Sequence, residues 1–215
     1  MTRLEEKATV IALRGREDIV LEGIFIRADD VESPGAVIAP PHPLYGGSMT
    51  SPVVGEVAWA CQRAGYATLR FEWRGVGASS GMPSGEAADA DADYGAALAH
   101  LGETVPGPLL AAGYSFGAAA ALRVAVKEPR VRRLVLVAPP AAWLDTDALS
   151  AFLGSTLVLT GADDGYAPRA QLEQALAGLP RCAFEVIPEA DHFFQVGLAD
   201  ISRVISSWLE AAPAR

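Results

Sequence analysis

Short apolar runs alternate along the chain with longer stretches in which alanine, leucine and charged residues recur at helical spacing. Runs such as AVIA, LVLVA and TLVLT are continuously apolar, which is typical of strands buried on both faces of a parallel sheet. The pattern predicts strands at Ala8–Leu13, Ile19–Arg27, Gly35–Ala39, Tyr66–Glu72, Pro108–Tyr114, Arg133–Ala138, Thr156–Thr160 and Ala183–Ile187. It predicts helices at Pro52–Ala64, Glu86–Leu101, Phe116–Lys127, Pro168–Ala177 and Leu198–Ala211. Such alternation indicates an α/β fold with right-handed crossovers.

Two features refine this architecture. The first two predicted strands carry more charge than the others and follow one another directly, so we expect an antiparallel pair at the sheet edge. Only Ala141–Gly154 separates two of the later strands, a gap that accommodates one short helix and no inserted lid. We therefore expect a single domain over residues 1–215.

Composition narrows the class of protein. The chain has 215 residues, of which 51% are hydrophobic, and its net charge is −9, from 17 Lys and Arg against 26 Asp and Glu. A negative surface disfavours electrostatic binding to nucleic acid or to an anionic membrane. Two cysteines, Cys61 and Cys182, are too few for a disulfide scaffold. The chain has no apolar run of ~18 residues and no signal core near its start. We expect a cytoplasmic protein without nucleic-acid or membrane partners.

The strongest local motif is Gly113-Tyr114-Ser115-Phe116-Gly117, which follows a predicted strand and opens a predicted helix. This is the context of a G-x-S-x-G nucleophile elbow, in which a sharp turn exposes the serine oxygen. The Phe116 N–H then lies at the positive end of a helix and points toward a developing oxyanion. The alternative is an ordinary serine helix cap with incidental glycines. The strand–turn–helix setting favours the nucleophile.

A serine nucleophile needs a base. Of the three histidines, His192 follows the last predicted strand, His100 ends a predicted helix and His42 precedes the serine. In the chain order Ser…Asp…His, only His192 is in position to act as the base.

The acid that orients this base is expected after the preceding strand, where two carboxylates, Asp163 and Asp164, are adjacent. We favour Asp164, because its spacing from Gly161 and Pro168 matches the usual acid loop. Asp163 then belongs to the turn. Asp191 is next to the histidine in sequence, but neighbouring side chains diverge.

The second oxyanion donor is expected in the loop that follows the third strand. Three prolines of this loop lack an N–H, so the backbone of Leu44 or Tyr45 is the candidate, and a Gly-Gly pair allows a tight turn. The residues that we expect to line the acyl pocket are His42, Met49, Trp143 and Phe193.

Taken together, these stretches resemble the α/β-hydrolase superfamily, and especially its small, lid-less bacterial hydrolases. The resemblance rests on PPHPLYGGSM, LRFEWRGVGASSG, GYSFG, TGADDGYAP and PEADHFF, which occur in family order. It implies an eight-stranded, mostly parallel sheet, a Ser115–Asp164–His192 triad and an oxyanion hole from Phe116 and the Leu44 region. Two positions depart from the family pattern: Glu72 stands where Asn or Asp is common, and Pro43 replaces a Gly.

These observations predict a serine hydrolase that cleaves a small or short-chain carboxylic ester and needs no metal or organic cofactor. The net charge disfavours strongly anionic esters unless a local arginine, such as Arg74, offsets it. A thioesterase, peptidase or acyltransferase with the same triad is an alternative, and so is a non-catalytic ligand-binding protein on this scaffold. Asp89, Asp91 and Asp93 alternate in a predicted helix and are interpreted as a charged helix face rather than a calcium loop.

Overall fold

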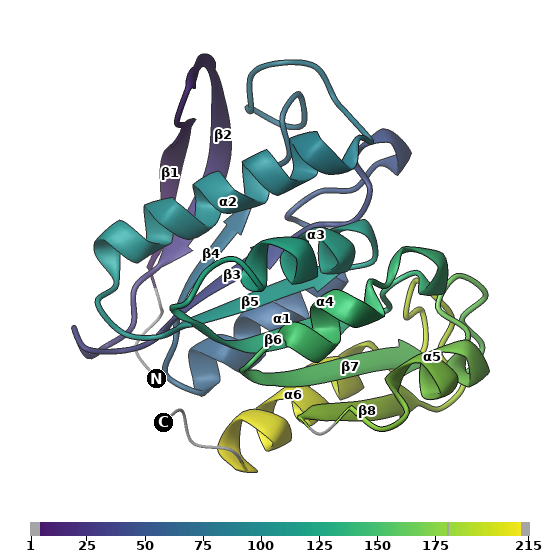
Figure 1. The fold of residues 1–215 in the computed structure, drawn as a ribbon. Coiled ribbons are helices and arrows are strands. Elements are labelled where there is room, and N and C mark those ends of the chain that lie inside the picture. The colour runs from purple at the N-terminus through teal and green to yellow at the C-terminus, as the bar shows by residue number, and fades with distance from the viewer. Residues whose placement is uncertain (1–4, 180, 212–215) are drawn as a thin grey trace.

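A mixed sheet of eight strands forms the centre of the structure, a computed structural model that describes residues 5–179 and 181–211 (Figure 1). The strand order is β1-β2-β4-β3-β5-β6-β7-β8. The strands are β1 (Glu6–Leu13), β2 (Arg16–Ile26), β3 (Gly35–Ala39), β4 (Ala67–Phe71), β5 (Leu109–Tyr114), β6 (Val131–Val137), β7 (Ser155–Gly161) and β8 (Cys182–Ile187). The helices are α1 (Pro52–Arg63), α2 (Ala87–Thr104), α3 (Phe116–Ala125), α4 (Thr146–Ala151), α5 (Arg169–Leu176) and α6 (Leu198–Ala211), with 3₁₀ turns η1 (Pro43–Tyr45) and η2 (Ala141–Trp143).

Strand pairing follows the sequence pattern. β1 and β2 form an antiparallel hairpin at one edge, and β2 joins β4 antiparallel. From β4 through β8 all neighbours are parallel. The predicted α/β fold with a mostly parallel sheet and an antiparallel edge pair is confirmed.

The helices cover both faces of this sheet. α1 packs against α6 on one face, whereas α2 packs against α3 on the other (Figure 1). The residues of β3 and β5 are all buried, which explains why their sequences are continuously apolar. Helix α3 begins with FGAAAA, and its small side chains allow the helix to approach the sheet closely.

Several element ends differ from the predicted ones. β4 ends at Phe71, although the Glu72 N–H still donates to the Glu22 carbonyl of β2. α3 ends at Ala125 rather than at Lys127, because the chain tightens there into a turn in which the Lys127 and Glu128 N–H groups donate to carbonyls three residues back, those of Val124 and Ala125. α2 extends beyond Leu101 to Thr104.

The chain between β6 and β7 is short. It holds only the turn η2 and the six-residue helix α4, which Asp145 caps by accepting a hydrogen bond from the Ala148 N–H at 2.9 Å. The predicted single short helix is confirmed, and the segment has no room for a lid domain. Among the described residues, no helix is both long and apolar enough to cross a membrane.

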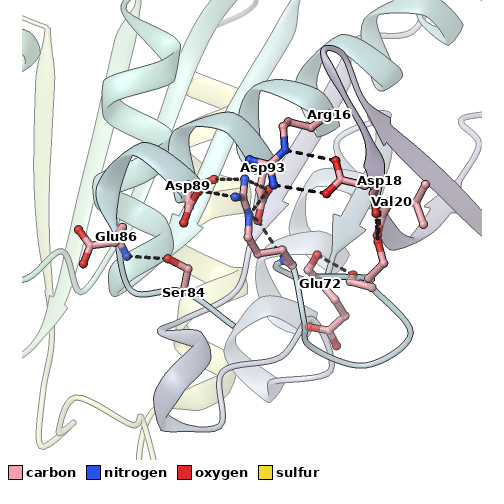
Figure 2. Close-up of polar contacts among 11 residues, drawn as sticks. Arg16, Asp18, Val20, Glu72, Ser84, Glu86, Asp89 and Asp93 are labelled. Atoms are coloured by element: carbon pink, nitrogen blue, oxygen red, sulfur yellow. Dashed lines mark hydrogen bonds and ion pairs between the residues drawn. The ribbon is translucent and has the colours of Figure 1, made fainter. Parts of the chain in front are cut away.

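A buried ion pair fixes the segment that follows β4 to helix α2. The Arg74 guanidinium lies 2.7 Å from Asp93 and also contacts Asp89, and the Arg74 N–H donates to Asp93 (Figure 2). The Asp93 side chain is only 1% exposed. The interpretation of these aspartates as a charged helix face is therefore wrong for Asp93, which is buried and whose pairing with Arg74 offsets the desolvation of its carboxylate.

Candidate active site

The candidate catalytic side chains lie at the carboxyl-terminal edge of the parallel strands. Ser115 follows β5, Asp164 follows β7 and His192 follows β8. Parallel strands end at the same edge of the sheet, so loops that are distant in sequence meet there. The loop after β3, which holds Leu44 and Tyr45, begins at this edge as well.

Ser115 occupies a strained turn between β5 and α3. Its φ is 55° and its ψ −116°, a conformation that non-glycine residues rarely adopt. The turn requires glycines on both sides. A Cβ on Gly113 would lie 2.2 Å from the Gly117 carbonyl oxygen, and one on Gly117 would lie 2.5 Å from that of Pro40. The Ser115 N–H donates to the Val137 carbonyl at 2.9 Å, which anchors the turn to β6.

Three side chains form one continuous hydrogen-bonded chain. Ser115 Oγ lies 3.0 Å from His192 Nε2, and His192 Nδ1 lies 2.8 Å from Asp164 Oδ2. All three residues are largely buried. The arrangement allows the histidine to accept the serine proton while a carboxylate holds the other ring nitrogen.

Asp164 is surrounded by donors. Its Oδ1 accepts the backbone N–H groups of Tyr166 and Ala167, both at 2.8 Å. Burial raises the pKa of this carboxyl, but the hydrogen bonds from His192 and from the two backbone N–H groups outweigh burial and hold its pKa below the ordinary value of 3.8. The carboxylate is therefore ionised at neutral pH.

The two other candidate carboxylates do not contact the histidine in this way. Asp163 is exposed. The Asp191 carboxylate accepts the N–H groups of Phe193 and Gln195, at 3.0 and 3.3 Å, and so caps the loop that carries His192. Of the three acids considered from the sequence, Asp164 is the one that the structure brings to the imidazole.

Tyr114 fixes the backbone of the histidine loop. Its hydroxyl donates to the His192 carbonyl at 2.8 Å, and burial raises the pKa of this phenol. This role of Tyr114 is not evident from the sequence. The only available signal is the position of Tyr114 within the elbow motif, next to Ser115.

The candidate oxyanion donors differ in their present partners. The Phe116 N–H belongs to the first turn of α3, where N–H groups have no intrahelical acceptor. In contrast, the Leu44 N–H donates to His42 Nδ1 at 3.2 Å and the Tyr45 N–H donates to the His42 carbonyl at 3.1 Å. Either N–H group must break its hydrogen bond to His42 before it can donate to an oxyanion.

Aromatic side chains surround the Ser115–His192 pair. The His42 ring lies 4.5 Å from Phe116 and 6.2 Å from Trp143, measured between centroids. The rings of Tyr166 and Phe193 lie 4.8 and 5.5 Å from that of His192, again between centroids. We call four side chains of these loops, each more than half exposed, the rim: Leu44, Tyr45, Tyr166 and Phe193.

The predicted pocket residues are placed differently from one another. Trp143 is 50% exposed and Phe193 belongs to the rim, whereas Met49 is 3% exposed and its N–H donates to Glu72. His42 is half-buried, and burial lowers the pKa of its imidazole. Tyr166 was missed by the sequence analysis, although it follows Asp164 closely within the acid loop.

Comparison with known proteins gives a family and several close folds. The family described as "Serine aminopeptidase, S33" matches residues 43–156. An alpha-beta serine hydrolase homologue from Coxiella burnetii is 28% identical, with a TM-score of 0.83, covering 97% of this chain and 100% of that chain. A protein of unknown function from Agrobacterium tumefaciens is 25% identical, with a TM-score of 0.86 and 95% coverage of both chains.

A third structure bears on the architecture alone. It is a serine hydrolase without a lid from Xanthomonas campestris, 24% identical, with a TM-score of 0.81, covering 100% of this chain and 99% of that chain. The shared fold lacks a lid, in agreement with the short segment between β6 and β7.

Proposed function

Because this chain belongs to the serine aminopeptidase S33 family of α/β hydrolases, we propose that it is a serine hydrolase that cleaves a carboxylic ester through an acyl-enzyme. The observation that carries the proposal is the chain of hydrogen bonds from Ser115 through His192 to Asp164. In this proposal Ser115 is the nucleophile, His192 the base and Asp164 the orienting acid.

The first half of the reaction acylates the enzyme. Ser115 Oγ attacks the ester carbonyl carbon while His192 Nε2 takes the hydroxyl proton, and Asp164 stabilises the imidazolium that forms. Collapse of the tetrahedral intermediate breaks the bond to the alcohol, and His192 returns its proton to the leaving oxygen. Water then attacks the acyl-enzyme with the same histidine as base, which releases the carboxylic acid and restores Ser115.

Two backbone N–H groups receive the negative charge of the carbonyl oxygen. One is that of Phe116, at the positive end of α3. For the other we favour Leu44 over Tyr45. The Leu44 N–H is held by a histidine side chain, whereas the Tyr45 N–H closes the 3₁₀ turn against a backbone carbonyl.

The surroundings of Ser115 favour an uncharged substrate with a small or short acyl group. The rim offers apolar contacts but no cation. Arg74 is unsuited to bind an anionic ester, because its side chain is buried against Asp93 and Asp89. The same negative charge of −9 that disfavours nucleic acid as a partner disfavours an anionic substrate.

A peptidase is the second candidate, because the matching family is described as serine aminopeptidases. Ester and amide hydrolysis use the same triad, and they differ in the leaving group that the histidine must protonate. Matched p-nitrophenyl ester, thioester and p-nitroanilide substrates separate these activities. We expect the highest kcat/KM for the ester, and a preference for the anilide would overturn the assignment to an esterase.

The test of the nucleophile uses a fluorophosphonate probe, which is attacked by an activated serine with loss of fluoride. Wild-type protein should be labelled at Ser115, and Ser115→Ala should lose both labelling and ester turnover. Ser207→Ala, an exposed serine on α6, is the matched control and should keep both. Absence of an adduct on the wild-type protein would instead indicate a non-catalytic ligand-binding protein.

A further inference from the structure

The loop that contains Leu44 is tied at both ends to two consecutive residues beyond β4. At its start, Trp73 Nε1 donates to the carbonyl oxygens of Pro40 and Pro41, at 3.2 and 3.0 Å. At its end, the Glu72 carboxylate accepts two hydrogen bonds from residues 48 and 49. The loop therefore begins and ends at one point of the sheet edge.

The contacts of Glu72 are short and specific. Ser48 Oγ donates to Glu72 Oε1 at 2.5 Å, and the Met49 N–H donates to Glu72 Oε2 at 3.0 Å. Each carboxylate oxygen thus has its own donor, and Glu72 is only 3% exposed. Ser48 also contacts Thr50 Oγ1 at 2.8 Å, which extends the network along the loop.

Burial of this carboxyl has an electrostatic penalty that the fold tolerates. Burial raises the pKa of Glu72, the bonds from Ser48 and Met49 oppose this rise, and the nearby carboxylate of Glu22 on β2 adds to it. A buried carboxyl is retained in a fold only where its hydrogen bonds are satisfied. Here the satisfied bonds all go to the loop that contains Leu44.

The backbone around Glu72 is itself held in place by polar contacts. The Glu72 carbonyl accepts from Ser79 Oγ at 3.1 Å, and two residues further on Arg74 is paired with Asp93 of α2 (Figure 2). Its side chain can therefore transmit a defined position to Ser48 and Met49.

Trp73, the residue after Glu72, also contacts Phe116, whose N–H is the other candidate oxyanion donor. The Trp73 ring packs edge-on against Phe116, with centroids 5.5 Å apart, and Gly117 allows α3 to approach the Pro40 carbonyl. Residues 72 and 73 thus hydrogen-bond to the loop that contains Leu44, and Trp73 also packs against the side chain of Phe116.

We propose that Glu72 is a positioning residue for the oxyanion hole, holding the loop of residues 42–49 beside Ser115 so that the Leu44 N–H, once it leaves His42 Nδ1, can bind the carbonyl oxygen of the substrate. This proposal rests on the serine hydrolase function proposed above. A donor that is displaced stabilises the transition state less than a well-placed one, while ground-state binding changes little. A defect in Glu72 should consequently lower kcat and leave KM nearly constant.

Three substitutions separate the length of this side chain from its charge. Glu72→Gln removes the charge but keeps the length of the side chain and both of its hydrogen bonds to the loop. Its amide oxygen can accept from the Met49 N–H, and its NH₂ can donate to Ser48 Oγ, which then donates to Thr50 Oγ1. Glu72→Asp keeps the charge but is one methylene shorter, and Glu72→Ala removes both bonds. Ser48→Ala removes one bond from the loop side. Glu22→Gln is the matched control, since Glu22 bonds to the Ala78 N–H and not to the loop.

Steady-state kinetics on p-nitrophenyl acetate give the readout. We expect kcat to fall about 10- to 100-fold in Glu72→Ala and about 10-fold in Glu72→Asp and Ser48→Ala, since loss of a whole oxyanion donor lowers kcat by about 10²–10³. KM should stay within about threefold. Glu72→Gln and Glu22→Gln should both stay within about threefold of the wild-type kcat.

The controls keep the result decisive. Circular dichroism and a thermal melt identify a variant that fails to fold, and if Glu72→Ala does so, Glu72→Asp and Ser48→Ala carry the test. Wild-type kcat in folded Glu72→Asp and Ser48→Ala, or a change confined to KM, would overturn the positioning role. If Ser115→Ala still hydrolyses the ester, the proposed function itself is wrong, and the role of Glu72 is overturned with it.

Discussion

His192 Nδ1 lies 2.8 Å from the Oδ2 of Asp164, a residue 28 positions earlier in the chain. The adjacent Asp163 is exposed, although its side chain carries the same charge and starts one residue away. Chemistry at this site therefore depends on the turn after β7, which turns one carboxylate inward and the other outward. The backbone N–H groups of Tyr166 and Ala167, which donate to Asp164, hold that turn.

The first prediction concerns this pair of aspartates. Asp164→Asn should lower kcat for a p-nitrophenyl ester by about 10⁴, because an amide no longer favours the imidazole tautomer that accepts the serine proton. Asp163→Asn, the matched control, should stay within about threefold of wild type. The reverse order would assign the acid to Asp163.

A second prediction concerns the backbone strain at Ser115. Its positive φ of 55° is unfavourable for any residue with a Cβ, so Ser115→Gly should be about 1 kcal/mol more stable than Ser115→Ala. Ser207 lies within helix α6, where the order should invert, and there glycine should be about 1 kcal/mol less stable than alanine. Urea denaturation of the four variants measures both differences. Equal stability of the two Ser115 variants would mean that the turn is unstrained.

A third prediction is that the protein becomes less stable at acidic pH, in part because Asp164 is protonated. Its folded pKa lies below the ordinary 3.8, so its ionised form is favoured by folding. The contribution is complete above about pH 4 and is lost as the pH falls through the lowered folded pKa. Asp164→Asn should therefore be less stable than wild type at pH 7, by on the order of 1 kcal/mol, and the gap should narrow below pH 4. A gap that is constant from pH 3 to pH 7 would contradict this assignment.

Much of the site could be predicted from sequence because its determinants are local. The glycines around Ser115, the position of Asp164 after a strand and the place of His192 after the last strand are all requirements of single turns. The contacts of Glu72 and Trp73 were not predictable, because they join residues 23 to 33 positions apart across two loops. The hydrogen bond from Leu44 to His42 depends on a rotamer, which no pattern of residue types encodes.

In the fold, too, local features could be predicted from the sequence and contacts between distant residues could not. The order and type of the strands follow from runs of apolar residues, whereas the burial of Asp93 follows from a partner on another element, Arg74. Aspartates in a helix usually lie on its solvent face. Asp93 does not, because its ion pair with Arg74, in the loop after β4, compensates the desolvation of its carboxylate.

That ion pair gives a fourth prediction. Asp93→Asn should destabilise the protein by about 3 kcal/mol, because it leaves the buried Arg74 guanidinium without its main counterion. The exposed Arg203–Asp200 pair on α6 is the control, and Asp200→Asn should change stability by less than about 1 kcal/mol. Chemical denaturation of both variants tests the difference, and similar small effects would show that the Arg74–Asp93 pair contributes little.

The last prediction concerns substrate selection next to Ser115. Trp143 is half-exposed, and its ring centroid lies 6.1 Å from that of Phe116 and 6.2 Å from that of His42, so an acyl chain that extends away from Ser115 can contact it. Trp143→Ala removes apolar contact area that a butyrate chain uses and that acetate is too short to reach. We expect kcat/KM to fall about 10-fold for p-nitrophenyl butyrate and less than about twofold for the acetate. Trp59, a half-exposed tryptophan on α1, is the matched control, and Trp59→Ala should change neither value. An equal loss for both esters in Trp143→Ala would mean that Trp143 supports the fold of the site rather than the acyl group.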